Sequence, residues 1–180
     1  MKGVVFTEFL EMVEDRFSAD MVDDILDEAN PASGGAYTAV GTYDHTEIVD
    51  LVSSLSRHTG MSANDLLRVF GQYLFGRFVE NYPAFFAGIN DSFTFLSGIE
   101  DIIHAEVRKL YNDAELPCFE IEQHDAQRLV LHYKSSRHFE DLAEGLVLGC
   151  IAYFGQNIRL QRETVGDAES RYERFILDRQ

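Results

Sequence analysis

The stretch from Ser92 to Arg137, SFTFLSGIEDIIHAEVRKLYNDAELPCFEIEQHDAQRLVLHYKSSR, contains the point at which the pattern of apolar residues changes. Its first part carries apolar residues at the three- and four-residue spacing of one helix face, and it predicts one long helix. These residues are Phe93, Leu96, Ile99, Ile103, Val107 and Leu110. The polar run that ends at Pro117 breaks this helix, and Phe119–Glu122 then alternates in polarity as a half-buried strand does. The chain is therefore predicted to be α+β, with helices first and strands later.

The second part of the stretch predicts a β-hairpin. A turn at residues 124–127 separates Phe119–Glu122 from a second extended run, Arg128–Ser135. Residues 158–162 and 172–177 predict another pair of strands, and an apolar stretch of helical spacing, 139–154, lies between the two pairs. Together these segments predict a small antiparallel sheet that follows the N-terminal helices.

The residues before this stretch predict four helices. Ser18 and Ser62 are suited to cap helix N-termini, while Asn30-Pro31, Gly60 and Tyr82-Pro83 are suited to end helices. The helix that begins after Ser62 is apolar on nearly all sides, so we expect it to lie at the centre of the molecule.

The amino-acid composition limits the classes of molecule that this protein is expected to bind. The 180 residues include 31 acidic and 15 basic side chains, and the net charge of -16 disfavours nucleic acid and anionic membranes as partners. The length predicts a single domain over residues 1–180. Two cysteines, no signal-peptide pattern and no apolar run of membrane-spanning length predict a soluble, cytoplasmic protein.

His104 is the histidine with the most informative surroundings. It follows two isoleucines, and Glu100 and Arg108 lie one helical turn away, so its ring is expected at the border of an apolar face. No second ligand lies three or four residues further on, which argues against a paired-histidine zinc site. A structural role is common for such a histidine. A single histidine beside a Phe-rich pocket also suits a cofactor that needs one protein ligand, and haem is the leading example.

Tyr133, Ser135 and Arg137 form the second candidate group. If the strand continues through them, alternate residues point the same way over about 13 Å, and two hydroxyls and a guanidinium share one face. This donor set suits a pair of carboxylates. The alternative is an ordinary polar strand face.

With His104, Pro117 and the pattern Tyr133-x-Ser135-x-Arg137 in this order, the chain resembles the H-NOX family of haem nitric oxide/oxygen binding domains. The resemblance extends to the Met1-Lys2-Gly3 start and to the segment 82–88, YPAFFAG. It implies one domain that holds haem b in a pocket between the helices and the mixed region. It further implies that His104 is the proximal iron ligand, that the tyrosine, serine and arginine hold the propionates, and that Pro117 packs against the porphyrin and distorts it.

The resemblance also indicates which gases bind. Dioxygen at ferrous haem needs a distal hydrogen-bond donor, and dioxygen-binding members of the family place a tyrosine five residues after the motif arginine, where this chain has Leu142. The other distal positions correspond to Val5, Phe9, Leu74, Phe78 and Leu146, all apolar. We therefore expect binding of nitric oxide and carbon monoxide with discrimination against dioxygen. Gln72, Tyr73 and Tyr153 are donors whose orientation the sequence leaves open.

By this resemblance the chain is a stand-alone sensor and not an enzyme. Nitric oxide is expected to break the bond between iron and His104, and the relaxed haem would signal by contact to a separate histidine kinase or cyclic-di-GMP synthase or phosphodiesterase. Two other classes remain open. A haem enzyme or gas carrier would need a distal acid–base group, and a cofactor-free acidic interaction module would use His104 only structurally.

Overall fold

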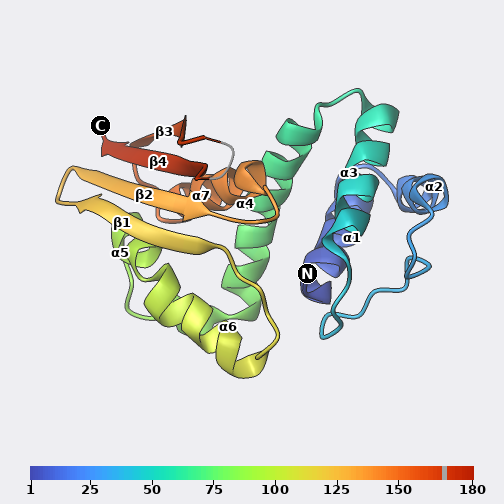
Figure 1. Ribbon diagram of the computed structural model, residues 1–180, viewed down its shortest axis with the longest axis horizontal. Coiled ribbons are helices and arrows are strands. Elements are labelled where there is room, and N and C mark those ends of the chain that lie inside the picture. The colour runs from blue at the N-terminus through green and yellow to red at the C-terminus, as the bar shows by residue number, and fades with distance from the viewer. Residues whose placement is uncertain (168–169) are drawn as a thin grey trace.

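The computed structural model describes residues 1–167 and 170–180, and the side chain of Leu110 lies outside this description, as does the prediction made for it. The architecture is α+β, as predicted (Figure 1). The N-terminal half contains α1 (Gly3–Arg16), α2 (Ala19–Ala29), α3 (His45–Thr59) and α4 (Ala63–Asn81). The rest contains η1 (Pro83–Phe85), α5 (Ser92–Ser97), η2 (Ile99–His104), α6 (Ala105–Leu110), β1 (Cys118–His124), β2 (Arg128–Lys134), α7 (Glu140–Tyr153), β3 (Ile158–Val165) and β4 (Tyr172–Arg179).

The predicted helix ends are confirmed by their capping geometry. The Ser18 hydroxyl accepts a hydrogen bond from the Met21 N–H at 3.1 Å, and the Ser62 hydroxyl accepts one from the Asp65 N–H at the same distance. Asn30 and Gly60 adopt left-handed backbone conformations, with φ of 45° and 73°, immediately after α2 and α3. These ends depend on residues within one turn of each other, which is why the sequence predicted them.

The strands form one antiparallel sheet in the order β1-β2-β4-β3. The two predicted pairs are joined through β2 and β4, so Tyr133 lies between Phe119 of β1 and Glu173 of β4. Leu129, Leu131, Phe175 and Leu177 are fully buried in one cluster with Val147 and Cys150 of α7. The sheet is therefore covered on one face by α7.

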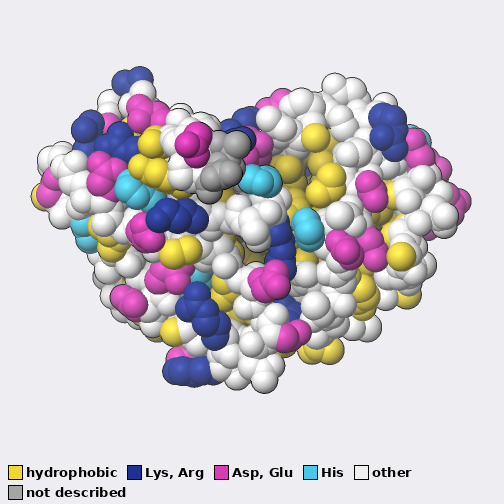
Figure 2. Space-filling view, viewed as in Figure 1, with side chains coloured by type: hydrophobic (Ala, Val, Ile, Leu, Met, Phe, Trp, Pro, Cys, Tyr) yellow, Lys and Arg dark blue, Asp and Glu magenta, His cyan; other side chains and the backbone are white. Residues whose placement is uncertain are grey.

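The core is divided into two clusters, one among the N-terminal helices and one between the sheet, α7 and α5. Helix α4 lies between the two lobes in Figure 1, which confirms its expected central place. Helices α4 and α7 pack closely where glycines meet, because a Cβ at Gly145 would overlap the Arg68 carbonyl oxygen. Figure 2 shows a surface hollowed along the boundary between the lobes, with charged side chains of both signs intermingled.

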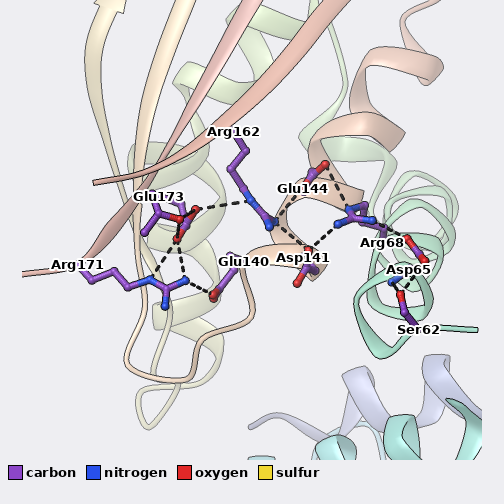
Figure 3. A network of polar contacts seen from close by, with 10 residues as sticks. Ser62, Asp65, Arg68, Glu140, Asp141, Glu144, Arg162, Arg171 and Glu173 are labelled. Carbon is purple, nitrogen blue, oxygen red and sulfur yellow. Dashed lines mark hydrogen bonds and ion pairs between the residues drawn. The ribbon is translucent and has the colours of Figure 1, made fainter. Parts of the chain in front are cut away.

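An ion-pair network ties α4 and α7 to the sheet (Figure 3). Arg68 of α4 contacts Asp141 at 3.0 Å and Glu144 at 3.3 Å, both on α7. Arg162 of β3 contacts the same two carboxylates at 3.0 and 2.7 Å, and it reaches Glu173 of β4 at 3.6 Å. Shared partly buried carboxylates with several donors fix the relative positions of the elements that carry them.

The predicted single long helix between residues 92 and 110 is wrong in detail. Helix α5 ends at Ser97, Gly98 follows, and the chain then forms a π-helix, η2, before α6 begins. The spacing of the apolar residues did not reveal this change. The wider turn of a π-helix changes the direction in which each side chain points, and the amino-acid composition of the segment gives no sign of it. The interruption matters because His104 is the last residue of η2.

No helix within residues 1–167 and 170–180 is long and apolar enough to cross a membrane.

Candidate functional site: an apolar cavity

A cavity of about 940 Å³ lies between α1, α4, α7 and the segment from α5 to the start of β1. This volume is within the range of small-molecule sites in proteins. Apolar side chains form most of its walls: Val4, Val5, Leu74, Phe75, Phe78, Phe86, Phe95, Leu96, Ile99, Ile103, Leu142, Leu146 and Val147. The cavity thus lies where the sequence placed it, between the helical part and the mixed region.

His104 lines this cavity from the end of η2 and is only 8% exposed. Its Nδ1 lies 2.8 Å from the Glu100 Oε1 atom. Burial lowers the pKa of His104, and the contact with Glu100 offsets that effect only in part. A neutral imidazole whose Nδ1–H is donated to a carboxylate keeps a lone pair on Nε2, so the ring is suited to bind one metal ion.

Glu100 is a site residue that the sequence presented only as a neighbour. Its Oε1 also accepts the Phe119 N–H at 2.9 Å, and its Oε2 accepts a hydrogen bond from Arg108 at 3.2 Å. Burial by itself would raise the pKa of Glu100, but the bonds from Phe119, His104 and Arg108 outweigh it and lower the pKa. The four-residue spacing of Glu100 and His104 is the sequence signal that pointed to this pair.

The hydrogen-bond donors Tyr133, Ser135 and Arg137 all belong to the cavity lining. Tyr133 is 4% exposed, and burial raises its pKa to about 12, so its hydroxyl stays protonated and can donate. The alternating-strand argument for this group is wrong, because β2 ends at Lys134. A turn stabilised by the Arg137 N–H, which donates to the Ser135 hydroxyl at 3.2 Å, brings the residues together instead.

Arg137 already binds a carboxylate of this chain. One guanidinium N–H contacts the Glu115 side chain at 2.5 Å and another contacts the Glu115 carbonyl oxygen at 3.2 Å. Glu115 is largely exposed, at 77% of its side-chain surface, and it also lines the cavity. The guanidinium is therefore oriented for carboxylate binding, which is the chemistry that a haem propionate requires. Nothing in the sequence singled out Glu115.

The predicted distal residues are nearly all in the wall. Val5, Leu74, Phe78, Leu142 and Leu146 line the cavity, as does Pro117. Phe9 is not in the lining, and its distal role stays a prediction. Its fully buried ring packs edge-to-face on Phe70 at 5.2 Å, in the core among the N-terminal helices. The Phe9 side chain follows the packing of α1 on α4.

The three polar residues left open by the sequence do not line the cavity. Gln72 is exposed, the Tyr73 hydroxyl donates to Asp15 at 3.1 Å, and Tyr153 is 49% exposed. Tyr82, which the sequence indicated only as a helix end, does belong to the lining beside Phe78. Its hydroxyl is one that the gas-binding argument did not consider, as are those of Tyr111, Tyr172 and Thr42 in the same lining.

One buried imidazole in an apolar cavity, with carboxylate-binding donors at the rim, is the chemistry of a haem-binding domain. The family model of Haem-NO-binding proteins matches residues 2–162. The chain therefore belongs to the H-NOX family of haem-based gas sensors.

Solved structures agree over the whole chain. An unliganded Fe(II) H-NOX protein from K. algicida, the A71G mutant, is 38% identical with a TM-score of 0.92, covering 100% of this chain and 97% of that one. The Shewanella woodyi H-NOX in the Fe(II)CO state, bound to IWP-051, is 38% identical with a TM-score of 0.86, covering 100% and 95%. The S. oneidensis H-NOX in the Fe(II)NO state is 28% identical with a TM-score of 0.89, covering 100% and 99%.

Proposed function

We propose that this chain senses nitric oxide through haem b held in the cavity, with His104 as the single protein ligand to the iron. The observation that carries the proposal is the buried His104 ring, whose Nδ1 is engaged by Glu100 while the ring lines a large apolar cavity. Tyr133, Ser135 and Arg137 would hold the propionates, since they supply two hydroxyl donors and a guanidinium at one end of that cavity. Pro117, in the same wall, would pack against the porphyrin.

The apolar wall supports discrimination between gases. Haem supplies a ferrous iron that binds diatomic gases, and the side chains around it decide which of them is retained. Leu142, Leu74 and Phe78 offer no hydrogen-bond donor to polar dioxygen, whereas nitric oxide and carbon monoxide need little polar support. We therefore propose that this chain binds nitric oxide and carbon monoxide and discriminates against dioxygen.

Signalling would use the His104 side of the cavity. His104 would hold the iron in the resting protein, and its release when nitric oxide binds would remove the constraint that this ligand places on the haem. We propose that a separate histidine kinase or cyclic-di-GMP enzyme in the cytoplasm reads the change by contact. Such a partner must bind the two states with different affinity, and a coupling of roughly 1–3 kcal/mol is typical.

An optical spectrum of the reduced protein tests this proposal. Nitric oxide should give the spectrum of an iron that has lost its bond to His104, and carbon monoxide should give a stable complex. Reduced protein in air should show no long-lived oxygen complex. If it does show one, selectivity for nitric oxide is refuted. Loss of that complex in Tyr82→Phe would then identify Tyr82 as the donor.

The ligand assignment has its own test in His104→Gly. The variant lacks the only proposed protein bond to iron while the apolar walls remain, so its haem content or its ferrous spectrum should change sharply, and added imidazole should restore the wild-type spectrum. An unchanged spectrum without imidazole would show that another residue binds the iron.

A further inference from the structure

We infer that Glu100 is the positioning residue of the iron ligand: its carboxylate fixes the orientation of the His104 ring and sets how strongly this ring donates to iron. The inference rests on the proposed function, because it takes His104 as the ligand. It concerns a residue that neither the sequence pattern nor the family match assigned to any role. Its basis is a set of three hydrogen bonds that meet on one partly buried carboxylate.

The first bond decides which ring nitrogen is available. With Nδ1 at 2.8 Å from the Glu100 Oε1, the proton of the neutral ring is held on Nδ1, and the Nε2 lone pair is free for iron. A carboxylate partner also increases the electron density of the ring, which makes a histidine a stronger metal ligand. Glu100 would thus strengthen the very bond that nitric oxide has to break.

The hydrogen bonds that Glu100 accepts from Phe119 and Arg108 weaken its effect on the electron density of the His104 ring. The Phe119 N–H donates to the same Oε1 at 2.9 Å, and Arg108 donates to Oε2 at 3.2 Å. Both donors draw negative charge away from the oxygen that faces His104. The ring therefore gains less electron density than a carboxylate without other hydrogen bonds would give it. Glu100 and its two donors therefore set an intermediate strength, which suits a ligand that has to be released on signal.

The same contacts hold Glu100 in place. Its side chain is 25% exposed, and its partners come from α6 and from β1. The Phe119 N–H lies two residues after Pro117, so one carboxylate connects the ligand-bearing helix to the start of the sheet. A carboxylate fixed from two elements cannot swing away from Nδ1 without losing several bonds at once.

The test compares Glu100→Gln with Asp101→Asn in haem-containing protein. Both variants remove one negative charge from the same turn, but Asp101 is exposed and makes no contact with His104 among the described residues. The first readout is the iron–histidine stretching frequency of the unliganded ferrous protein, by resonance Raman spectroscopy. It should fall in Glu100→Gln and stay at the wild-type value in Asp101→Asn. The second readout is the midpoint potential, which should rise more in Glu100→Gln than in the control, because the ferric iron loses electron donation.

Arg108→Ala gives a shift of the opposite sign. The Arg108 side chain is half exposed, so its removal should be tolerated. Without this competing donor Glu100 acts more strongly on the ring, and the stretching frequency should rise. If Glu100→Gln fails to take up haem, the direction of the shift in Arg108→Ala decides the question.

The inference is overturned if Glu100→Gln matches the wild-type frequency, or if Arg108→Ala shows no rise. Its failure can be told apart from failure of the proposed function. An unchanged ferrous spectrum in His104→Gly would refute the ligand assignment itself. A changed spectrum in His104→Gly with a wild-type frequency in Glu100→Gln would refute only the role of Glu100.

Discussion

At the residue scale, the cavity lining contains the imidazole of His104 and the guanidinium of Arg137. Burial is the main cause that lowers the pKa of His104, and Arg137 has Glu115 as its carboxylate partner. Glu115 occupies the guanidinium as a propionate would, so this contact shows the geometry of carboxylate binding within the chain itself. Arg137 therefore offers the sharpest single-residue test of the polar end of the cavity.

Arg137→Ala should accelerate haem loss by roughly 10- to 100-fold, since a charge-assisted hydrogen bond contributes about 1.5–3 kcal/mol. Transfer of haem to an excess of an acceptor protein measures the rate. Arg128→Ala is the matched control, because Arg128 begins β2, the strand that leads to Arg137, and it pairs with Asp178 away from the cavity lining. Equal rates for both variants would mean that the Arg137 guanidinium does not hold the propionates.

At the element scale, the cavity depends on how closely α4 and α7 approach. Gly71 and Gly145 face each other across this contact, and a Cβ on either would overlap the backbone of the other helix. Both helices supply cavity walls, Leu74 and Phe78 from one and Leu142 and Leu146 from the other. Small residues at the crossing therefore set the width of the cavity.

Gly145→Ala should lower the free energy of unfolding by about 1–3 kcal/mol, because the added methyl group must push the two backbones apart. Gly76→Ala in the neighbouring helix α4 is the control, since a Cβ there meets open space. Replacing an unconstrained helical glycine should stabilise by about 0.5–1 kcal/mol. Urea unfolding monitored by circular dichroism measures the free energy of unfolding of both variants. If Gly145→Ala leaves this free energy unchanged, the two helices can move apart at little energetic cost.

At the scale of the whole molecule, Asp91 joins three distant segments. It caps α5 through the Thr94 N–H at 3.0 Å, and it accepts hydrogen bonds from Gln156 after α7 at 2.9 Å and from Arg179 at the end of β4. Burial would raise the pKa of Asp91, but these bonds outweigh it and hold the pKa well below its usual range. The carboxylate therefore stabilises the fold only while it is ionised.

The sign of the pH dependence follows from this lowered pKa. As the pH falls, Asp91 is protonated in the unfolded chain before it is protonated in the folded protein. Its contribution to the free energy of unfolding is therefore complete above about pH 4 and is lost as the pH falls towards the pKa of Asp91 in the folded protein. Asp91→Asn keeps a capping oxygen but removes the charge, and at pH 7 it should be less stable by about 1–2 kcal/mol. The difference should shrink below pH 4 in thermal unfolding. Asp23→Asn, at an exposed position of α2, is the control and should show no such change. A stability difference between the wild type and Asp91→Asn that does not vary with pH would contradict the role of the ionised carboxylate.

The sequence by itself determined the features that depend on neighbouring residues. Ser18, Ser62 and Gly60 marked helix ends because caps act within one turn, and alternating polarity marked the strands. The order of His104, Pro117 and Tyr133-x-Ser135-x-Arg137 was enough to indicate the family, because the spacing of these residues can be read directly from the chain.

Only the tertiary structure decided which side chains meet. The π turn changed the surroundings of His104, Phe9 turned into the core while Tyr82 joined the cavity wall, and Glu115 paired with Arg137 across 22 residues. Glu100 reached both His104 and the Phe119 backbone for the same reason. Such contacts depend on how α4 packs on α7 and on how the loop before β1 returns to the sheet. Packing of this kind joins residues far apart in the chain, and no local pattern records it.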